Sequence, residues 1–319
     1  MGHPPNTTIT QCPALDPVVN LLTDYQRYSL VTLEIVITIL TILANTVVIF
    51  TIIKTNQHKE RTMNLIILIS VSDLLVALFS QPFKLRYFYN SHNEDSTCSS
   101  YILIFFAIYF FPLFSFYMIF IVVYNNHVKL KYMCHYRDQL DTLKLVSHVL
   151  YLGVLALLQS ITLGIAVAIN LHFLTSLLTP FELIGFLVAF TLQMRSHGRM
   201  KQYQKLKREI ELEQHNLTEQ LEELSHANHE THTLCTLYLI TSAIAKSPVF
   251  MSELSIYITH ETTNAQAMAV MFGYALSNCT CISNPVTFIV VNKEACKTCK
   301  RFLRKLFFPK KHRILPSPK

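Results

Sequence analysis

The chain has 319 residues, of which 51% are hydrophobic and 15% are charged, and its mean hydropathy is +0.34. This composition is typical of an integral membrane protein. The net charge of +7 is concentrated in the loops on one side of the apolar segments, so it indicates a membrane-facing collar and not a nucleic-acid-binding surface.

Apolar stretches of about 20 residues or more are long enough to cross the hydrocarbon core of a bilayer. The sequence contains seven of them, at 30–53, 64–83, 101–124, 145–169, 173–194, 234–258 and 266–291. We therefore predict an all-α membrane protein with a seven-transmembrane helix bundle over 30–291. Pro180 and Glu182 interrupt the fifth stretch, so a bundle of six helices is the alternative.

Basic residues predict the orientation of the bundle. With the N-terminus outside, the outer loops and tail hold only Arg27, Lys84 and Arg86, and Lys246 lies within a span. The other 23 of the 27 Lys and Arg residues are then cytoplasmic, which is a strong positive-inside bias. The N-terminal tail, 1–29, is expected outside. It has no pattern of a cleavable signal peptide.

Two features of the outer segments suggest modification. Asn6 begins an Asn-Thr-Thr glycosylation acceptor in the predicted outer tail. Cys12 and Cys98 are the two cysteines on the oxidising side, so they could form a disulfide or remain as two free thiols.

The largest cytoplasmic connection is the loop at about 195–233, where a stretch without Gly or Pro predicts helix extending beyond the membrane. The C-terminal segment, 292–319, begins with basic residues alternating with Phe and Leu. This pattern predicts an amphipathic helix at the membrane surface. Cys296 and Cys299 lie in it and are candidate palmitoylation sites, with two unmodified thiols as the alternative.

Several motifs, in order and on the expected spans, carry a resemblance to a known family. They are Asn45 in LANTVVIF, Asp73 in LISVSDLLVAL, Pro248 in the sixth span, and Asn284-Pro285 followed three residues later by Phe288. The chain resembles a rhodopsin-like (class A) G-protein-coupled receptor over roughly 28–308. The resemblance implies a plasma-membrane receptor that signals to a heterotrimeric G protein and needs no cofactor or metal, with helix breaks at the two prolines.

The departures from the family pattern concern its signalling residues. The acidic-Arg-aromatic triplet expected at the inner end of the third helix appears as Asn125-Asn126-His127, which the resemblance would place on the G-protein face. Lys246 replaces the aromatic residue that usually stands two positions before the sixth-helix proline. The chain has no Trp, so the fourth-helix tryptophan is also missing.

Depth along the spans, at 1.5 Å per residue, places five polar side chains in one slab near the midplane. They are Asn45, Asp73, Ser115, Lys246 and Asn284. In hydrocarbon each needs a partner, so we expect all five to face inward. We predict an ion pair between Asp73 and Lys246. A sodium ion at Asp73, as the resemblance implies, and a deprotonated lysine are the alternatives.

The resemblance also implies a ligand cavity in the outer half of the bundle. Its expected lining is Gln81, Tyr101, Phe105, Ile108, Tyr109, Glu253 and Tyr257. Ile108 stands where amine receptors have an aspartate, so a monoamine ligand is not expected. Glu34, Glu182 and Glu253 lie near outer span ends, where carboxylates extending to the interface are the default; for Glu253 a ligand role is the alternative.

The sequence thus predicts a receptor that conveys an extracellular or membrane-borne signal to a G protein. Two alternatives remain: a seven-helix binding receptor without the usual signalling, and an ion or proton transporter that uses Asp73 and Lys246. An enzyme is not predicted, because the sequence has no nucleophile–base pairing and no metal-ligand cluster.

Overall fold

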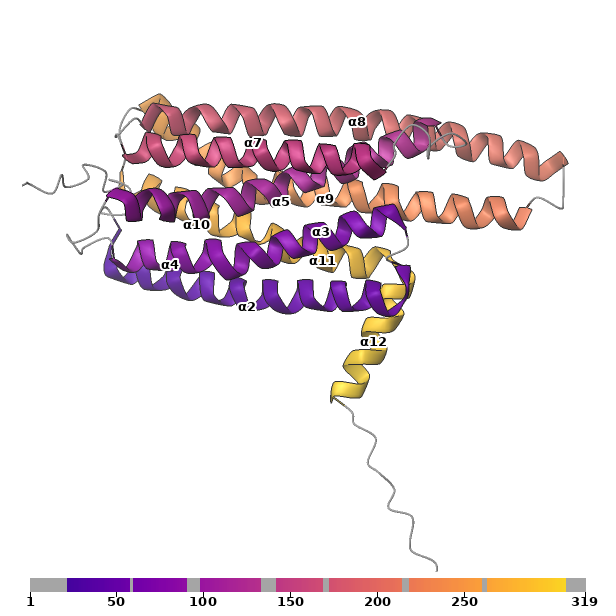
Figure 1. Ribbon diagram of the computed structural model, residues 1–319, viewed down its shortest axis with the longest axis horizontal. Coiled ribbons are helices and arrows are strands. Elements are labelled where there is room, and N and C mark those ends of the chain that lie inside the picture. The colour runs from indigo at the N-terminus through magenta and orange to yellow at the C-terminus, as the bar shows by residue number, and fades with distance from the viewer. Residues whose placement is uncertain are drawn as a thin grey trace, which may run out of the picture.

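The computed structural model describes residues 22–57, 60–90, 98–132, 142–168, 172–213, 218–259 and 263–307. They contain helices and no strand, which confirms the predicted all-α class (Figure 1). The helices are α2 (Asp24–Lys54), α3 (Arg61–Leu75), the π-helical segment η2 (Val76–Ser80), α4 (Gln81–Asn90), α5 (Cys98–Tyr132), α7 (Thr142–Ala168), α8 (His172–Glu213), α9 (Thr218–Thr259), α10 (Asn264–Asn278), α11 (Thr280–Val291) and α12 (Lys293–Phe307).

Six helical segments among the described residues are long and apolar enough to cross a membrane. They are Asp24–Lys54, Arg61–Arg86, Phe106–Tyr132, Leu143–Ile165, Asn228–Ser255 and Asn264–Val291. These agree with six of the seven predicted spans. The remaining one, on α8, does not meet the same measure within the described residues, but α8 packs lengthwise on α5, α7 and α9 (Figure 1).

Local sequence signals position the helix ends. The Thr23 hydroxyl accepts the Gln26 backbone N–H while the Gln26 side chain accepts the Thr23 backbone N–H, so a capping box starts α2. Thr263 and Gln266 repeat the arrangement at the start of α10. Helix α2 begins at Asp24, six residues before the first predicted span at 30–53.

The second span is not a regular α-helix. Between α3 and α4 it widens into η2, which ends two residues before Pro82 in α4. A π-turn inserts one extra residue, which rotates the following side chains by about 100° relative to an unbroken helix. Lys84, on the outer part of this span, is turned into the bundle and is only 6% exposed.

The helical extension predicted for the long loop at about 195–233 is present. Helix α8 continues to Glu213 and α9 begins at Thr218, and both project beyond the rest of the bundle (Figure 1). Helix α12 leaves the bundle at a steep angle. The helix predicted for this segment is therefore present, and its side chains at Lys293, Lys297, Lys300, Arg301 and Arg304 are exposed while Ala295 is buried.

Three predicted modification sites lie wholly or partly outside this description. Asn6 and Cys12 are outside the described residues, and the side chain of Cys98 is as well. Their glycosylation and disulfide bonding therefore stay predictions.

Candidate functional site

The carboxylate of Asp73, on α3, is fully buried at the centre of the bundle. The Ser115 hydroxyl of α5 donates a hydrogen bond to it, and Asn284 Nδ2 of α11 donates another over 3.4 Å. The Cys281 thiol is a third hydrogen-bonding neighbour. Four of the five residues predicted to share a polar slab, including Asn45, are thus brought together.

Asn45 has a role that follows from the proline in α11. Pro285 has no N–H, so the carbonyl of Cys281, four residues earlier, loses its helical partner. Asn45 Nδ2 donates to this carbonyl over 2.8 Å and to the Thr41 carbonyl over 2.9 Å. The asparagine of α2 therefore stabilises the helix break next to Asp73.

Lys246 does not pair with Asp73, so our prediction for this residue is wrong. Its ammonium forms an ion pair with Glu182 of α8 and lies 3.9 Å from the centroid of the Phe116 ring. Depth along the spans placed Lys246 at the right level, but it does not determine which way a side chain points around the bundle. Glu182 is only 20% exposed and does not extend to the interface as expected.

A second buried ion pair lies nearer the outer face. Glu34 of α2 is 1% exposed, its carboxylate lies 3.6 Å from Lys84 Nζ, and Asn278 Nδ2 of α10 donates to both carboxylate oxygens over 3.1 Å. The expectation that Glu34 extends to the interface is therefore wrong. Glu34 lies ten residues into α2, about 15 Å from its start, and this depth is the signal that could have identified it.

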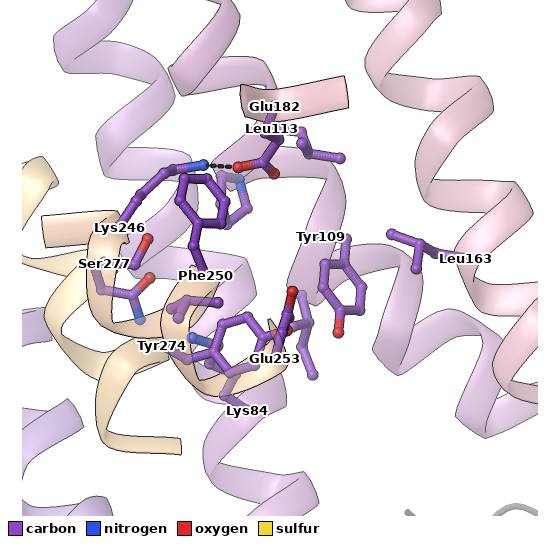
Figure 2. Close-up of a pocket in the computed structure, with 14 residues that line it drawn as sticks. Lys84, Tyr109, Leu113, Leu163, Glu182, Lys246, Phe250, Glu253, Tyr274 and Ser277 are labelled. Carbon is purple, nitrogen blue, oxygen red and sulfur yellow. Dashed lines mark hydrogen bonds and ion pairs between the residues drawn. The ribbon is translucent and has the colours of Figure 1, made fainter. Parts of the chain in front are cut away.

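Lys246, Glu182 and Lys84 border one cavity of about 90 Å³ (Figure 2). Of the residues predicted to line it, Ile108, Tyr109 and Glu253 do so. Gln81 is instead buried elsewhere, and the side chains of Tyr101, Phe105 and Tyr257 lie outside the description. Sequence reasoning missed other lining residues, among them Lys84, Glu182, Lys246 and Tyr274.

The cavity has two charged ends. The Lys246–Glu182 pair lies at one end, and Glu253, Tyr274, Tyr109 and Lys84 gather at the other (Figure 2). The Tyr274 hydroxyl donates to Glu253 over 2.7 Å, and Lys84 Nζ lies 5.6 Å from the centroid of the same ring.

A smaller cavity of about 20 Å³ connects this region to the Asp73 cluster. Lys246, Pro112 and Asn278 line both cavities, while Ser115 and Cys281, the neighbours of Asp73, line only the smaller one. The smaller space has room for about one water molecule. The outer cavity therefore adjoins a space that two neighbours of Asp73 line, although Asp73 itself lines neither cavity.

The residues predicted to meet a G protein are closed inside the bundle. Asn125 and Asn126 are fully buried and His127 is 9% exposed. His127 Nδ1 lies 3.0 Å from the Ser196 hydroxyl of α8, and both amide atoms of Asn126 have no partner among the described residues.

Side-chain hydrogen bonds from Gln193 join α8 to α9. Gln193 Nε2 donates to the His232 carbonyl over 3.0 Å and to the Thr236 hydroxyl over 2.7 Å. The His232 ring in turn stacks on His197, with 3.3 Å between their nearest nitrogens.

Cys296 and Cys299 are half-buried free thiols on one side of α12. Burial, and then the nearby Cys296, raise the pKa of the Cys299 thiol. Their acylation stays a prediction. In the part of the chain described, no three His, Cys, Asp or Glu side chains are arranged to hold a metal ion.

No protein-family model matches the chain, and no curated protein sequence matches it.

Proposed function

We propose that the chain is a seven-helix receptor of the plasma membrane that transmits the binding of an extracellular or membrane-borne ligand to a heterotrimeric G protein. The observation that carries this proposal is the adjacency of the outer cavity to the buried Asp73 cluster. A ligand that moves Lys246 or Asn278 alters the wall of the smaller cavity and hence the surroundings of Asp73.

The proposal takes α8 as the fifth of seven spans in chain order, in addition to the six spans described above. It packs on α5, α7 and α9, and its Leu183, Ile184, Leu187 and Val188 are exposed, as lipid-facing side chains would be. The positive-inside distribution supports an N-terminus outside and a long α8–α9 extension in the cytoplasm.

Signalling would follow from two arrangements of the helices, with the ligand favouring one of them. The closed arrangement has Asn126 and His127 buried and α9 held to α8 through Gln193 and His232. Pro248 interrupts the hydrogen bonding of α9 and allows its inner part to swing outward. The outward movement would expose the inner end of α5 to a G protein.

The test is nucleotide exchange on representative heterotrimers of each G-protein class, with the purified protein in lipid nanodiscs. Gln193→Leu removes the donors that hold α9 to α8, so we expect a several-fold rise in basal exchange with at least one heterotrimer. Gly198→Ala is the matched control, because Gly198 lies five residues further along α8 with nothing within 4 Å of an added methyl group. If neither Gln193→Leu nor any ligand from a screen changes exchange, G-protein coupling is refuted.

A second candidate is a binding receptor without G-protein signalling. It is favoured by Asn125-Asn126 in place of the family's acidic-Arg pair and by the complete burial of both side chains. This candidate predicts ligand binding with exchange at the basal rate. The transporter alternative is weakened, because Lys246 pairs with Glu182 and not with Asp73. Ion flux in liposomes is its test.

A further inference from the structure

The C-terminal end of α5 is fixed against α8 at two successive levels. The Ser196 hydroxyl donates to the Leu192 carbonyl over 2.8 Å, so it accepts the hydrogen bond from His127 Nδ1 of α5, 3.0 Å away. About one turn further along both helices, Leu130 and Met200 pack against each other as a small buried cluster. The side chains that flank these contacts therefore also lie close together.

This packing gathers three basic side chains. Lys131 and Arg199 are the chain neighbours of the two apolar residues, and Arg195 lies one turn before Arg199 on α8. The positive charges of all three act on the His127 ring, that of Arg199 most strongly, so the three surround one part of the structure. Like charges gathered in this way repel one another, and an anion between them would reverse the sign of the interaction.

Arg199 has a hydrogen-bond donor that the described part of the protein does not use. The Nη1 atom of its guanidinium is buried and has no hydrogen-bond partner among the described residues. A buried donor without an acceptor is costly. The side chains of Arg195 and Lys131 are exposed beside it. Guanidinium groups match the oxygens of a phosphate group, which can accept hydrogen bonds from both arginines at once.

The surface of α8 next to these cations is apolar. Leu187, Phe190 and Met194 lie within about 12 Å of Arg195 along the helix axis, and each is more than half exposed. This apolar face leads directly into the basic group. A phospholipid has both complementary parts, with acyl chains for the apolar face and a phosphorylated headgroup for the cations.

We propose that Lys131, Arg195 and Arg199 bind the headgroup of an anionic phospholipid that carries phosphomonoester groups. Basic groups between helices at the cytoplasmic membrane surface suit such headgroups, because several cations share the charge of one headgroup. A phosphomonoester has a charge of about −1.5 to −2, more than the single phosphodiester of other anionic lipids. This inference rests on the proposed placement of α8 in the membrane, and on neither a ligand nor a G protein.

The experiment measures lipid bound to the purified full chain in a neutral detergent by native mass spectrometry. The main probe is dioctanoyl phosphatidylinositol bisphosphate. It is compared with dioctanoyl phosphatidylinositol, dioctanoyl phosphatidylserine, and inositol trisphosphate as the headgroup without acyl chains. We expect the bisphosphate lipid to bind about tenfold more tightly than each of the others, as additional charged hydrogen bonds and chain contacts allow.

These probes test the proposal on the unmodified protein. Equal or tighter binding of phosphatidylinositol or phosphatidylserine would overturn the preference for phosphomonoester groups. Equal or tighter binding of inositol trisphosphate would overturn the lipid and indicate a site for a soluble phosphate compound.

Arg195→Gln combined with Arg199→Gln removes two cations and keeps polar side chains. We expect the affinity for the bisphosphate lipid to fall about thirtyfold, from about fivefold for each cation. Lys300→Gln combined with Arg304→Gln is the matched control, because it removes two exposed cations from α12 and should leave the affinity unchanged. An equal loss in this control would indicate attraction to the overall charge and overturn the site, as would an unchanged affinity in the α8 variant.

Acidic residues that follow α5 provide a further comparison. Asp138 and Asp141 belong to the segment 133–141, which lies outside the described residues. Asp138→Asn combined with Asp141→Asn should leave the affinity unchanged. A thirtyfold gain would mean that these carboxylates hold Arg199 in the unmodified chain, and would overturn its role in lipid binding. Nucleotide exchange is a separate measurement, so failure of the lipid site and failure of G-protein coupling are distinguishable.

Discussion

A double-mutant cycle can distinguish pairing of Lys246 with Glu182 from pairing of Lys246 with Asp73. Replacing Lys246 with Met keeps the apolar stem but leaves Glu182, which is 20% exposed, without its ammonium. Exposed pairs contribute up to about 1 kcal/mol, whereas breaking a buried pair costs about 3–5 kcal/mol. The small exposure of both side chains places this pair nearer the buried limit, and the contact with Phe116 adds to it. We expect a loss of about 3 kcal/mol.

The assay is a double-mutant cycle on the free energy of unfolding, measured by titrating the protein in mixed micelles with a denaturing detergent. Glu182→Gln in the Lys246→Met background should restore most of the loss, giving a coupling energy of about 2 kcal/mol. The losses of unfolding free energy caused by Asp73→Asn and Lys246→Met should add in the double variant. Lys246→Met should also leave the effect of sodium on the free energy of unfolding unchanged. A coupling of Lys246 to Asp73 and none to Glu182 would refute the reasoning.

Two other contacts give predictions measured by the same unfolding assay. Glu34→Gln leaves Lys84 buried without its carboxylate and should cost about 3 kcal/mol, whereas no loss would indicate a carboxylate exposed at the interface. Gly273→Ala would place a methyl group 2.9 Å from the Val249 backbone nitrogen, so separation of α9 and α10 should cost about 1–3 kcal/mol. Gly198→Ala meets no atom within 4 Å and should stabilise α8 by roughly 0.5–1 kcal/mol; a cost as large as at Gly273 would contradict the packing.

Polar residues in apolar spans were informative in the sequence because hydrocarbon offers them no partner. This physical rule identified Asn45, Asp73, Ser115 and Asn284 as a group, and the structure brings them together through hydrogen bonds. The same rule, applied with the depth along α2, would have identified Glu34. Glu34 lies only four residues from the start of the apolar run at 30–53, but ten residues from the start of α2. The apolar run therefore underestimates how deep Glu34 lies in the bundle.

Lys246 was predicted at the correct depth and with the wrong partner. Charge pairing in a bundle depends on the direction of each side chain around its helix and on which helices are neighbours, and both arise from packing. Phe116, Glu182 and Lys246 come from three helices far apart in the sequence. The π-turn before Lys84 is a further example, because it changes the direction in which the side chains after it point around the helix axis.

The sequence by itself determined the helical class with spans of membrane-crossing length, the approximate positions of six of these spans and the polar group around Asp73. These follow from local quantities: the length of apolar runs, capping residues, prolines, and the cost of a polar group in lipid. Only the tertiary structure decided that Lys246 pairs with Glu182, that Glu34 pairs with Lys84, and that the Asn126 side chain is fully buried. The physical reason is that such pairings depend on how neighbouring helices are rotated and packed, and the sequence of one helix does not contain that information.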